Sequence, residues 1–234
     1  MSTQQDVKTI AFVIYQGLTL LDLAGPLGVL QKFCEFNPEY QTAIVAERLE
    51  PIISDNGLTV IPDRTFSDLP HPFALFVPGG SSPTLKAMAN PSIRSYVRRA
   101  AESSEFVGSV CTGALILASI GLLEGKPATT HWAYRSILQS LGSPYERKRW
   151  VENGKIINSA GVSAGVDMAL FFVSRLAGEE MARKVQLWLD YDPDPPFRID
   201  WDHLGLMPRF MLGYHAVAAP FITSDAKKLL REGR

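Results

Sequence analysis

Apolar residues fall in short, almost continuous runs along much of the chain, separated by glycine, proline and polar residues. Runs of this length without alternation are typical of strands that are covered on both faces, as in a parallel sheet. The pattern predicts strands over residues 8–15, 40–47, 73–80 and 106–110.

Helical spacing of apolar residues follows most of these strands. The clearest helix start is at Asn90, a suitable N-cap, with Pro91 at the first helical position. Gly121 ends the helix that follows the fourth strand. Helices are predicted over residues 17–36, 90–103, 112–120, 132–141, 166–178 and 179–191. Strands that alternate with helices pair in parallel with helices on both faces, so we expect an α/β fold.

Glycine, asparagine and proline mark the turns and one boundary. The turn residues 55–57 and 153–154, each between apolar runs, predict two β-hairpins. The run DPDPPF at residues 192–197 is a break in composition. We therefore expect one domain over residues 1–197 and a C-terminal arm over residues 198–234. The arm is too apolar to remain in water, so it packs on the domain or on a dimer partner.

The composition is that of an ordinary globular protein, with 46% of the 234 residues hydrophobic and 20% charged. A net charge of −1 leaves no basic excess for phosphates, so we expect no nucleic-acid partner. No apolar run reaches the ~18 residues of a membrane span, and the first residues lack the features of a signal peptide. The two cysteines are too few for a disulfide framework and fit a reducing compartment. We expect a cytoplasmic protein that does not bind membranes.

Cys111 lies where a predicted strand ends and the next helix begins. In an open parallel sheet, binding sites form at the carboxyl ends of strands. The helix that starts at Thr112 directs unpaired N–H groups and its positive dipole end toward the sulfur, which favours a nucleophilic thiolate. The small residues Gly113 and Ala114 leave amides free to hold a developing anion. We therefore expect a reactive cysteine at position 111 and a structural one at Cys34.

Two residues are candidates to move protons for this cysteine. Asp22 is a lone carboxylate among leucines just after the first strand, where burial is costly unless the group has a partner or shares a proton. The alternative is that Asp22 caps its helix. His131 begins another helix twenty residues after the cysteine and is either a catalytic residue or a satisfied structural histidine.

A serine nucleophile is a rival interpretation. Residues 161–165 match G-x-S-x-G around Ser163, between a predicted strand and a predicted helix. Asp190 with His203 or His215 would complete the order Ser, Asp, His. Only 69 residues follow the motif, and they lack the further strands that carry the acid and the histidine. A glycine turn where two backbones approach closely explains the motif better.

No metal or nucleotide site is indicated, and we expect no cofactor. Residues 190–194 begin like a calcium loop, but Pro195 takes the glycine position and Trp201 that of the closing glutamate. The histidines show no ligand spacing. Gly79 and Gly80, which follow a strand, lack the rest of a phosphate-binding motif, so an oxyanion turn fits them better.

Several motifs in the right order resemble the PfpI/ThiJ superfamily. They are LDLAGP, FVPGG, SVCTGALILASIGLLEGKPATTHW and GVSAGVDMAL, and with VQLWLDYDPDPPF they are most similar to its isocyanide hydratase (isonitrile hydratase) branch. The resemblance covers about residues 7–197. It implies a flavodoxin-like three-layer α/β/α sandwich of the class I glutamine amidotransferase-like kind, with a mostly parallel sheet and a nucleophile elbow. The same cysteine block occurs in sensor domains of AraC-type regulators, but the 37 residues after Phe197 are too few for their helix-turn-helix domain.

The resemblance also implies roles for individual residues. Cys111 matches the catalytic nucleophile, Asp22 the catalytic acid that faces it, and Thr112 the residue that follows the nucleophile. Gly79 and Gly80 match the turn whose backbone amides line the site.

Other features of the resemblance leave the substrate open. His131 matches a histidine that other branches place beside the cysteine. The chain departs from the pattern at Ser159-Ala160-Gly161-Val162, where a more glycine-rich turn ending in isoleucine is expected. The implied activity is that of a hydro-lyase, which converts isocyanides to N-substituted formamides through a thioimidate on Cys111. Amide hydrolysis or glyoxalase-type chemistry, both with an essential His131, and redox sensing without turnover are the alternatives. The implied partners are a small-molecule substrate and a second copy in a homodimer.

Overall fold

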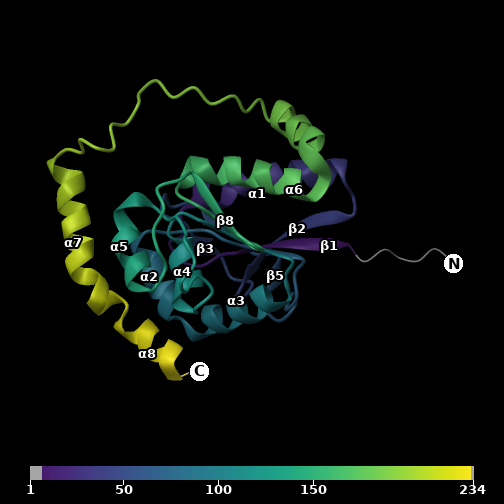
Figure 1. Cartoon of the computed structure of the whole chain (residues 1–234). Helices are drawn as coiled ribbons and strands as arrows, with labels where there is room; N and C mark the ends of the chain where they lie inside the picture. The colour runs from purple at the N-terminus through teal and green to yellow at the C-terminus, as the bar shows by residue number, and fades with distance from the viewer. Residues whose placement is uncertain (1–6, 233–234) are drawn as a thin grey trace.

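A mostly parallel sheet runs through the centre of the molecule (Figure 1). The computed structural model describes residues 7–232. Within that range the main sheet contains β1 (Lys8–Val13), β2 (Tyr40–Ala46), β5 (Arg64–Thr65), β6 (Ala74–Val77), β7 (Phe106–Val110), β8 (Trp150–Asn153) and β9 (Ile156–Ser159), and a separate hairpin contains β3 (Ile52–Ile53) and β4 (Thr59–Val60). The order is β5-β2-β1-β6-β7-β9-β8, and neighbouring strands are parallel except β8 with β9. The order reverses between β1 and β6, so residues that follow these strands face one crevice.

Helices cover both faces of this sheet (Figure 1). They are α1 (Leu20–Phe36), α2 (Ser82–Ala89), α3 (Pro91–Ser103), α4 (Gly113–Ser119), the 3₁₀ helix η1 (Trp132–Tyr134), α5 (Arg135–Ser140), α6 (Val162–Trp188), α7 (Leu206–Ile222) and α8 (Ser224–Glu232). The helices α1 and α6 pack against each other on one face, and α2, α3 and α4 form the layer on the other. The predicted three-layer α/β/α arrangement is confirmed.

The central strands are buried on both faces, as their unbroken apolar runs predicted. Every residue of β6 is buried, and so are the last four residues of β1. The rings of Phe12 and Phe76 stack across these two strands at 5.2 Å, and Phe172 of α6 packs edge-on against Phe76 at 5.3 Å. This core fixes the carboxyl ends of the strands, where the candidate site lies.

The turns and caps lie where the sequence placed them. The strands β3 and β4 pair across residues 55–57, and β8 and β9 pair across residues 153–154. The Asn90 side chain caps α3 by accepting hydrogen bonds from two amides of its first turn. The two long helices predicted near the end meet at Gly178, whose φ of 85° breaks the helical geometry within α6.

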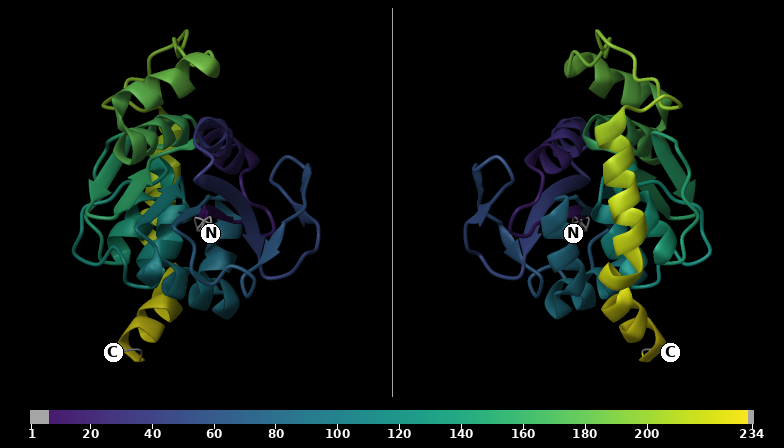
Figure 2. Two further views of the ribbon diagram at one scale, coloured as in Figure 1. Left: turned by 90° about the vertical axis from the view of Figure 1, so that its right-hand side faces the viewer. Right: turned by 90° about the vertical axis from the view of Figure 1, so that its left-hand side faces the viewer.

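Beyond α6 the chain forms an exposed connector, residues 191–205, that arcs away from the sheet before α7 begins (Figure 1). Helix α7 then lies along the outside of the molecule (Figure 2). The His215 Nδ1 atom lies 2.6 Å from the carbonyl oxygen of Ala133, and the hydroxyls of Ser140 and Thr223 are 2.8 Å apart. The arm therefore contacts its own chain, and its contact with a second chain stays a prediction. None of the helices in residues 7–232 has the length and apolar character needed to cross a membrane.

Candidate active site

The chain turns sharply at Cys111, between β7 and α4. The Cys111 backbone has a φ of 56°, in the left-handed region, which costs a non-glycine residue about 1–3 kcal/mol. Its amide donates to the Ser159 carbonyl at 3.0 Å, and the Thr130 hydroxyl donates to its carbonyl at 2.9 Å. A Cβ at Gly113 would lie 2.0 Å from the Val77 carbonyl oxygen, so this turn requires glycine there. These contacts form the nucleophile elbow that the sequence predicted.

Asp22 approaches the cysteine from the first turn of α1 and is fully buried. Its Oδ2 atom accepts a hydrogen bond from the Gly79 amide at 3.2 Å. Its Oδ1 atom is buried and has no hydrogen bond of normal geometry with any residue that the structure describes. The N-cap position of α1 belongs to Thr19. Asp22 is therefore not a helix cap, because its one bonded oxygen is held by a different loop.

Burial governs the charge of both groups. Desolvation raises the pKa of Asp22 to about 7, although the neighbouring Cys111 thiol and the Gly79 amide lower it in part. Desolvation also raises the pKa of the Cys111 thiol well above its usual range, and the charge of Asp22 raises it further. The expectation that the helix start favours the thiolate was therefore wrong for an ionised Asp22, because Cys111 is only 3% exposed and a charge there loses its hydration.

The two groups behave as a pair that shares one proton. When Asp22 is ionised, the thiol keeps its proton. When Asp22 is protonated, the negative charge that opposes the thiolate is gone, and the hydrogen bond from the Thr112 backbone amide favours the charged sulfur. Both arrangements carry one negative charge, so moving the proton between them brings no new charge into the dry site. A transfer of the proton from Cys111 to Asp22 would create a nucleophile and an acid together.

Thr112 holds the glycine turn beside the cysteine through a chain of buried hydrogen bonds. Its hydroxyl accepts from the amides of Gly80 at 3.0 Å and Ser81 at 3.1 Å, so its own proton is donated to Thr84 Oγ1 at 2.7 Å. Thr84 in turn donates to the Tyr15 hydroxyl at 3.0 Å, which donates to a carbonyl of the same turn at 2.9 Å. Neither Thr84 nor Tyr15 was singled out from the sequence, because no motif marks them.

The amides expected to line the site are engaged within the protein. Gly79 donates to Asp22, and Gly80 donates to Thr112. A Cβ at Gly79 would lie 2.7 Å from the Thr112 nitrogen and 2.8 Å from Asp22 Oδ2, so glycine is needed there. In this structure the two glycines position the catalytic candidates, and their role as anion donors stays a prediction.

His131 caps η1, with its Nδ1 atom accepting a hydrogen bond from the Ala133 amide at 3.4 Å. Its ring packs against Trp132 at 5.5 Å. Burial and the nearby His215 lower the pKa of His131, so the ring is neutral at pH 7. Among the residues described, His131 has no hydrogen bond to Cys111, and a catalytic role for it stays a prediction.

A cavity of about 590 Å³ lies at the carboxyl end of β9, near the elbow. Its lining is Thr130, His131, Trp132, Tyr145, Arg147, Lys148, Arg149, Ala160, Gly161, Val162, Ser163, Ala164 and Trp201. The wall adjoins the elbow, since Thr130 bonds to the Cys111 carbonyl and Ala160 follows the residue that accepts from the Cys111 amide. The segment 159–162, where the chain departs from the family pattern, thus contributes to the wall. Neither Cys111 nor Asp22 is among these lining residues.

The two histidines of the rival serine interpretation are hydrogen-bonded to other residues. Ser163 is exposed at the start of α6. The His203 Nδ1 atom lies 2.8 Å from Asp200, and His215 donates to a carbonyl before α5 at 2.6 Å. A Cβ at Gly165 would lie 3.0 Å from the Val110 side chain of β7, so this glycine serves close packing of α6 against a side chain, not the close approach of two backbones that was expected.

Two further expectations concerned Cys34 and metal binding. Cys34 is half-buried, and desolvation raises the pKa of its thiol to about 11, which fits a structural residue. In the part of the chain that the structure describes, no group of three or more His, Cys, Asp or Glu side chains is arranged to hold a metal ion. The absence of a cofactor stays an expectation.

Several known proteins are similar to this chain. The DJ-1/PfpI family model matches residues 8–175. An isonitrile hydratase from Pseudomonas putida is 39% identical over 188 residues, which are 80% of each chain. The crystal structure of a ThiJ/PfpI family protein from Pseudomonas syringae has a TM-score of 0.79 and 32% identity, covering 95% of this chain and 90% of that one. A DJ-1 superfamily protein from Salmonella typhimurium shares the fold, with a TM-score of 0.69 and 21% identity over 79% of this chain and 99% of that one.

Proposed function

Because this chain belongs to the DJ-1/PfpI family, we propose that it is a cysteine-dependent hydratase that converts isocyanides to N-substituted formamides. The observation that carries the proposal is the buried Asp22–Cys111 pair, in which burial raises the pKa of Asp22 to about 7. The similarity to an isonitrile hydratase supports the reaction class. The pair supports the chemistry, since it offers a sulfur nucleophile and a carboxylic acid in one dry site.

The reaction needs both partners at one atom. The terminal carbon of an isocyanide accepts a nucleophile and must also receive a proton. The Cys111 thiolate attacks that carbon, forming a C–S bond, while the Asp22 proton is transferred to the same carbon. The product is a thioimidate, R–N=CH–S, bound to Cys111, and Asp22 is left as a carboxylate. An acid with a pKa near the working pH is well suited to give and regain this proton.

Water completes the reaction. The Asp22 carboxylate removes one proton from a water molecule as its oxygen attacks the thioimidate carbon, and this proton is passed to the substrate nitrogen. The tetrahedral intermediate then collapses. Its C–S bond breaks, the thiolate leaves, and the hydroxyl proton returns to Asp22 as the carbonyl forms. The sum is R–NC plus H₂O to R–NH–CHO, with the pair restored to its starting state.

The burial of the sulfur suits a slender reacting group. Cys111 is 3% exposed and is not among the residues that line the cavity. An isocyanide is linear at its reacting end and forms only weak hydrogen bonds, so its carbon can approach a buried thiol while the rest of the molecule stays in the cavity. The Oδ1 atom of Asp22 has no hydrogen-bond partner among the described residues and is free to carry the proton.

The test is the rate at which the protein forms formamide from an aryl isocyanide. We expect turnover by the wild type and by Cys34→Ala, the matched control, and only the background rate for Cys111→Ala. Asp22→Asn should lose roughly 100-fold or more, the size of a general-acid contribution. Full activity of Cys111→Ala would end the proposal.

The same assay separates the other reactions known in the superfamily. Methylglyoxal and a chromogenic amide are offered beside the isocyanide, and we expect product from the isocyanide alone. Turnover of the aldehyde or the amide that disappears in His131→Ala would point to the alternative chemistry. Loss of the thiol to mild peroxide, with no turnover of any substrate, would favour a redox sensor.

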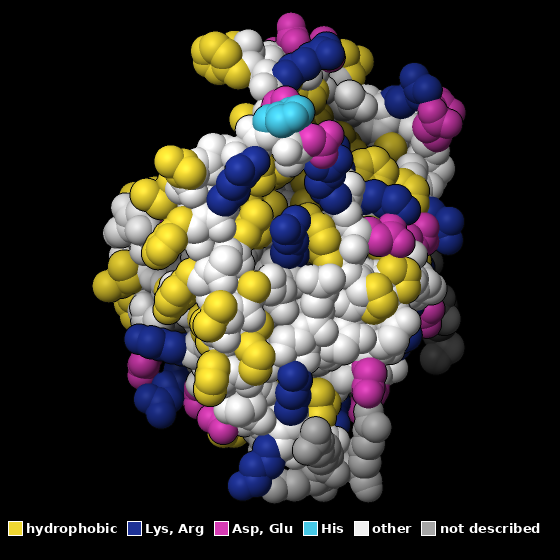
Figure 3. Space-filling view, turned by 60° about the vertical axis from the view of Figure 1, so that its left-hand side comes forward, with side chains coloured by type: hydrophobic (Ala, Val, Ile, Leu, Met, Phe, Trp, Pro, Cys, Tyr) yellow, Lys and Arg dark blue, Asp and Glu magenta, His cyan; other side chains and the backbone are white. Residues whose placement is uncertain are grey.

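We also propose that the protein forms a homodimer in the cytoplasm. The outer face of α7 carries a stripe of apolar side chains, which is visible in Figure 3. Its members are Leu206, Met207, Phe210, Val217 and Phe221, which are 68–88% exposed. Such a patch is unusual on a monomer. Sedimentation velocity of the wild type and of Phe210→Asp checks this, and a monomeric wild type would refute it.

A further inference from the structure

We infer that Trp201, carried on the C-terminal connector, closes the candidate cavity and selects isocyanides with a flat aromatic substituent. The inference rests on the proposed function for the isocyanide group. The preference for an aromatic substituent and the role of Trp201 rest on the cavity and the connector. The sequence assigned no function to the region after residue 197. Under this inference, that region contributes directly to substrate recognition.

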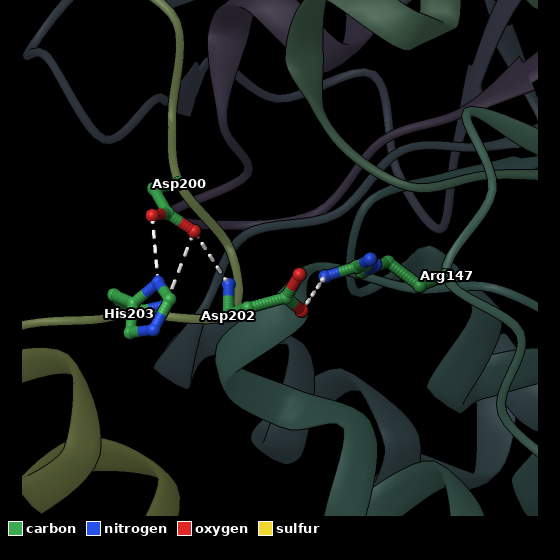
Figure 4. A network of polar contacts seen from close by, with 4 residues as sticks. All are labelled: Arg147, Asp200, Asp202 and His203. Atoms are coloured by element: carbon green, nitrogen blue, oxygen red, sulfur yellow. Dashed lines mark hydrogen bonds and ion pairs between the residues drawn. The ribbon is translucent and has the colours of Figure 1, made fainter.

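The connector is fastened to the cavity rim at both ends. At its start, the Tyr191 hydroxyl donates to Asp167 at 2.7 Å, and Asp167 also pairs with Arg149. Near its end, Asp202 pairs with Arg147 at 3.5 Å, as Figure 4 shows. Arg147 and Arg149 both line the cavity. Arg147 thus contacts the end of the connector directly, next to Trp201, and Arg149 is linked to its start through Asp167 of α6.

A compact turn presents Trp201 to the cavity. The Asp200 carboxylate accepts hydrogen bonds from the amides of Asp202 at 3.0 Å and His203 at 3.2 Å, and also contacts the His203 ring (Figure 4). Along the connector the exposed fraction of the large apolar side chains falls from 81% at Phe197 to 42% at Trp201. Trp201 is less exposed than Phe197 and Ile199, and its ring contacts Trp132 edge-on at a centroid distance of 6.4 Å.

The size and lining of the cavity indicate the substituent. Its volume of about 590 Å³ is well above the ~150 Å³ that holds one benzene ring in an apolar protein cavity, so a bicyclic ring fits. Trp132, Trp201 and Tyr145 line it, and aromatic side chains favour a flat aromatic ligand over a small alkyl group.

The rim charges favour a neutral ligand. Arg147 pairs with Asp202 and Arg149 with Asp167. Lys148 pairs with Glu146 at 2.6 Å. Each cation on the rim is therefore matched by a carboxylate, and the rim offers little to an anionic substrate.

The experiment compares kcat and KM for 2-naphthyl isocyanide and for tert-butyl isocyanide. The variants are Trp201→Ala, the conservative Trp201→Phe, and Phe197→Ala as a matched control, an exposed aromatic of the same connector outside the cavity. In Trp201→Ala we expect KM for the naphthyl substrate to rise roughly 3- to 10-fold, with kcat and the tert-butyl KM within about 2-fold. Trp201→Phe should restore most of the loss, and Phe197→Ala should match the wild type.

A binding measurement separates this inference from the proposed function. The dissociation constant of N-(2-naphthyl)formamide, measured by equilibrium dialysis, needs no turnover. Weaker binding of the formamide to Trp201→Ala than to Phe197→Ala supports the inference, even if the protein hydrates no isocyanide. Absence of hydration would refute only the proposed function. The inference about Trp201 would be overturned by equal KM increases for both substrates in Trp201→Ala. Equal formamide binding by the wild type and Trp201→Ala would also overturn it.

Discussion

Replacing Asp22 by asparagine should change how the stability of the protein depends on pH. The side chain keeps its shape, but it no longer titrates. In the wild type the carboxyl is fully buried, and burial raises its pKa to about 7, against 3.8 for an unperturbed aspartate. The folded protein therefore holds the Asp22 proton over a pH range in which the unfolded chain has already released it.

The sign and size of the effect follow from proton linkage. A raised pKa in the folded state contributes stability that is fully present below pH 3.8 and is lost as the pH rises to about 7. Each pKa unit corresponds to about 1.36 kcal/mol, so the whole loss is about 4 kcal/mol. No discount for solvent screening applies, because the Asp22 side chain is 0% exposed.

The assay is urea unfolding at several pH values from 4.5 to 8.5, followed by circular dichroism. The unfolding free energy of the wild type relative to Asp22→Asn should fall by about 3–4 kcal/mol between about pH 4.5 and 7.5, and then level off. Asp192→Asn, at an exposed position, serves as the control for a generic loss of charge. If the difference between wild type and Asp22→Asn stays constant with pH, Asp22 is not the shifted group and the shared-proton description is wrong.

Three further predictions concern the same site. Hydration activity should rise as the pH passes about 7, because the pair then loses one of its two protons and reaches the state that supplies a thiolate and an acid together; a rate that falls between pH 6 and 8 would contradict this. Thr84→Val should lower the unfolding free energy by roughly 1–3 kcal/mol in urea titrations, since Thr112 and Tyr15 lose their shared buried partner. Gly113→Ala should destabilise the protein by roughly 3 kcal/mol or more, because the new Cβ would meet the Val77 carbonyl oxygen at 2.0 Å. Gly28→Ala, with nothing within 4 Å of the added Cβ, should be neutral or stabilising, and similar losses for both helical glycines would refute the steric reasoning.

Short apolar runs and turn residues allowed most of the sheet to be predicted. Buried strands have an unbroken apolar pattern, and Asn-Gly turns have a specific backbone requirement, so both leave local marks in the sequence. The two-residue strand β5, the helix α2 and the helices of the arm escaped prediction. These elements depend on contacts with distant parts of the chain, and their own sequences carry a weak signal.

Of the site, the sequence by itself determined which side chains meet at the edge of the sheet. Cys111 follows one strand, Asp22 follows another, and parallel strands bring their carboxyl ends together. Only the tertiary structure decided their charge, since desolvation depends on neighbours far away in the sequence, and it reversed the expected direction of the Cys111 pKa. It also decided that Trp201 lines the cavity, because the course of a connector without regular structure is set by the contacts of Tyr191 and Asp202 with residues far away in the sequence.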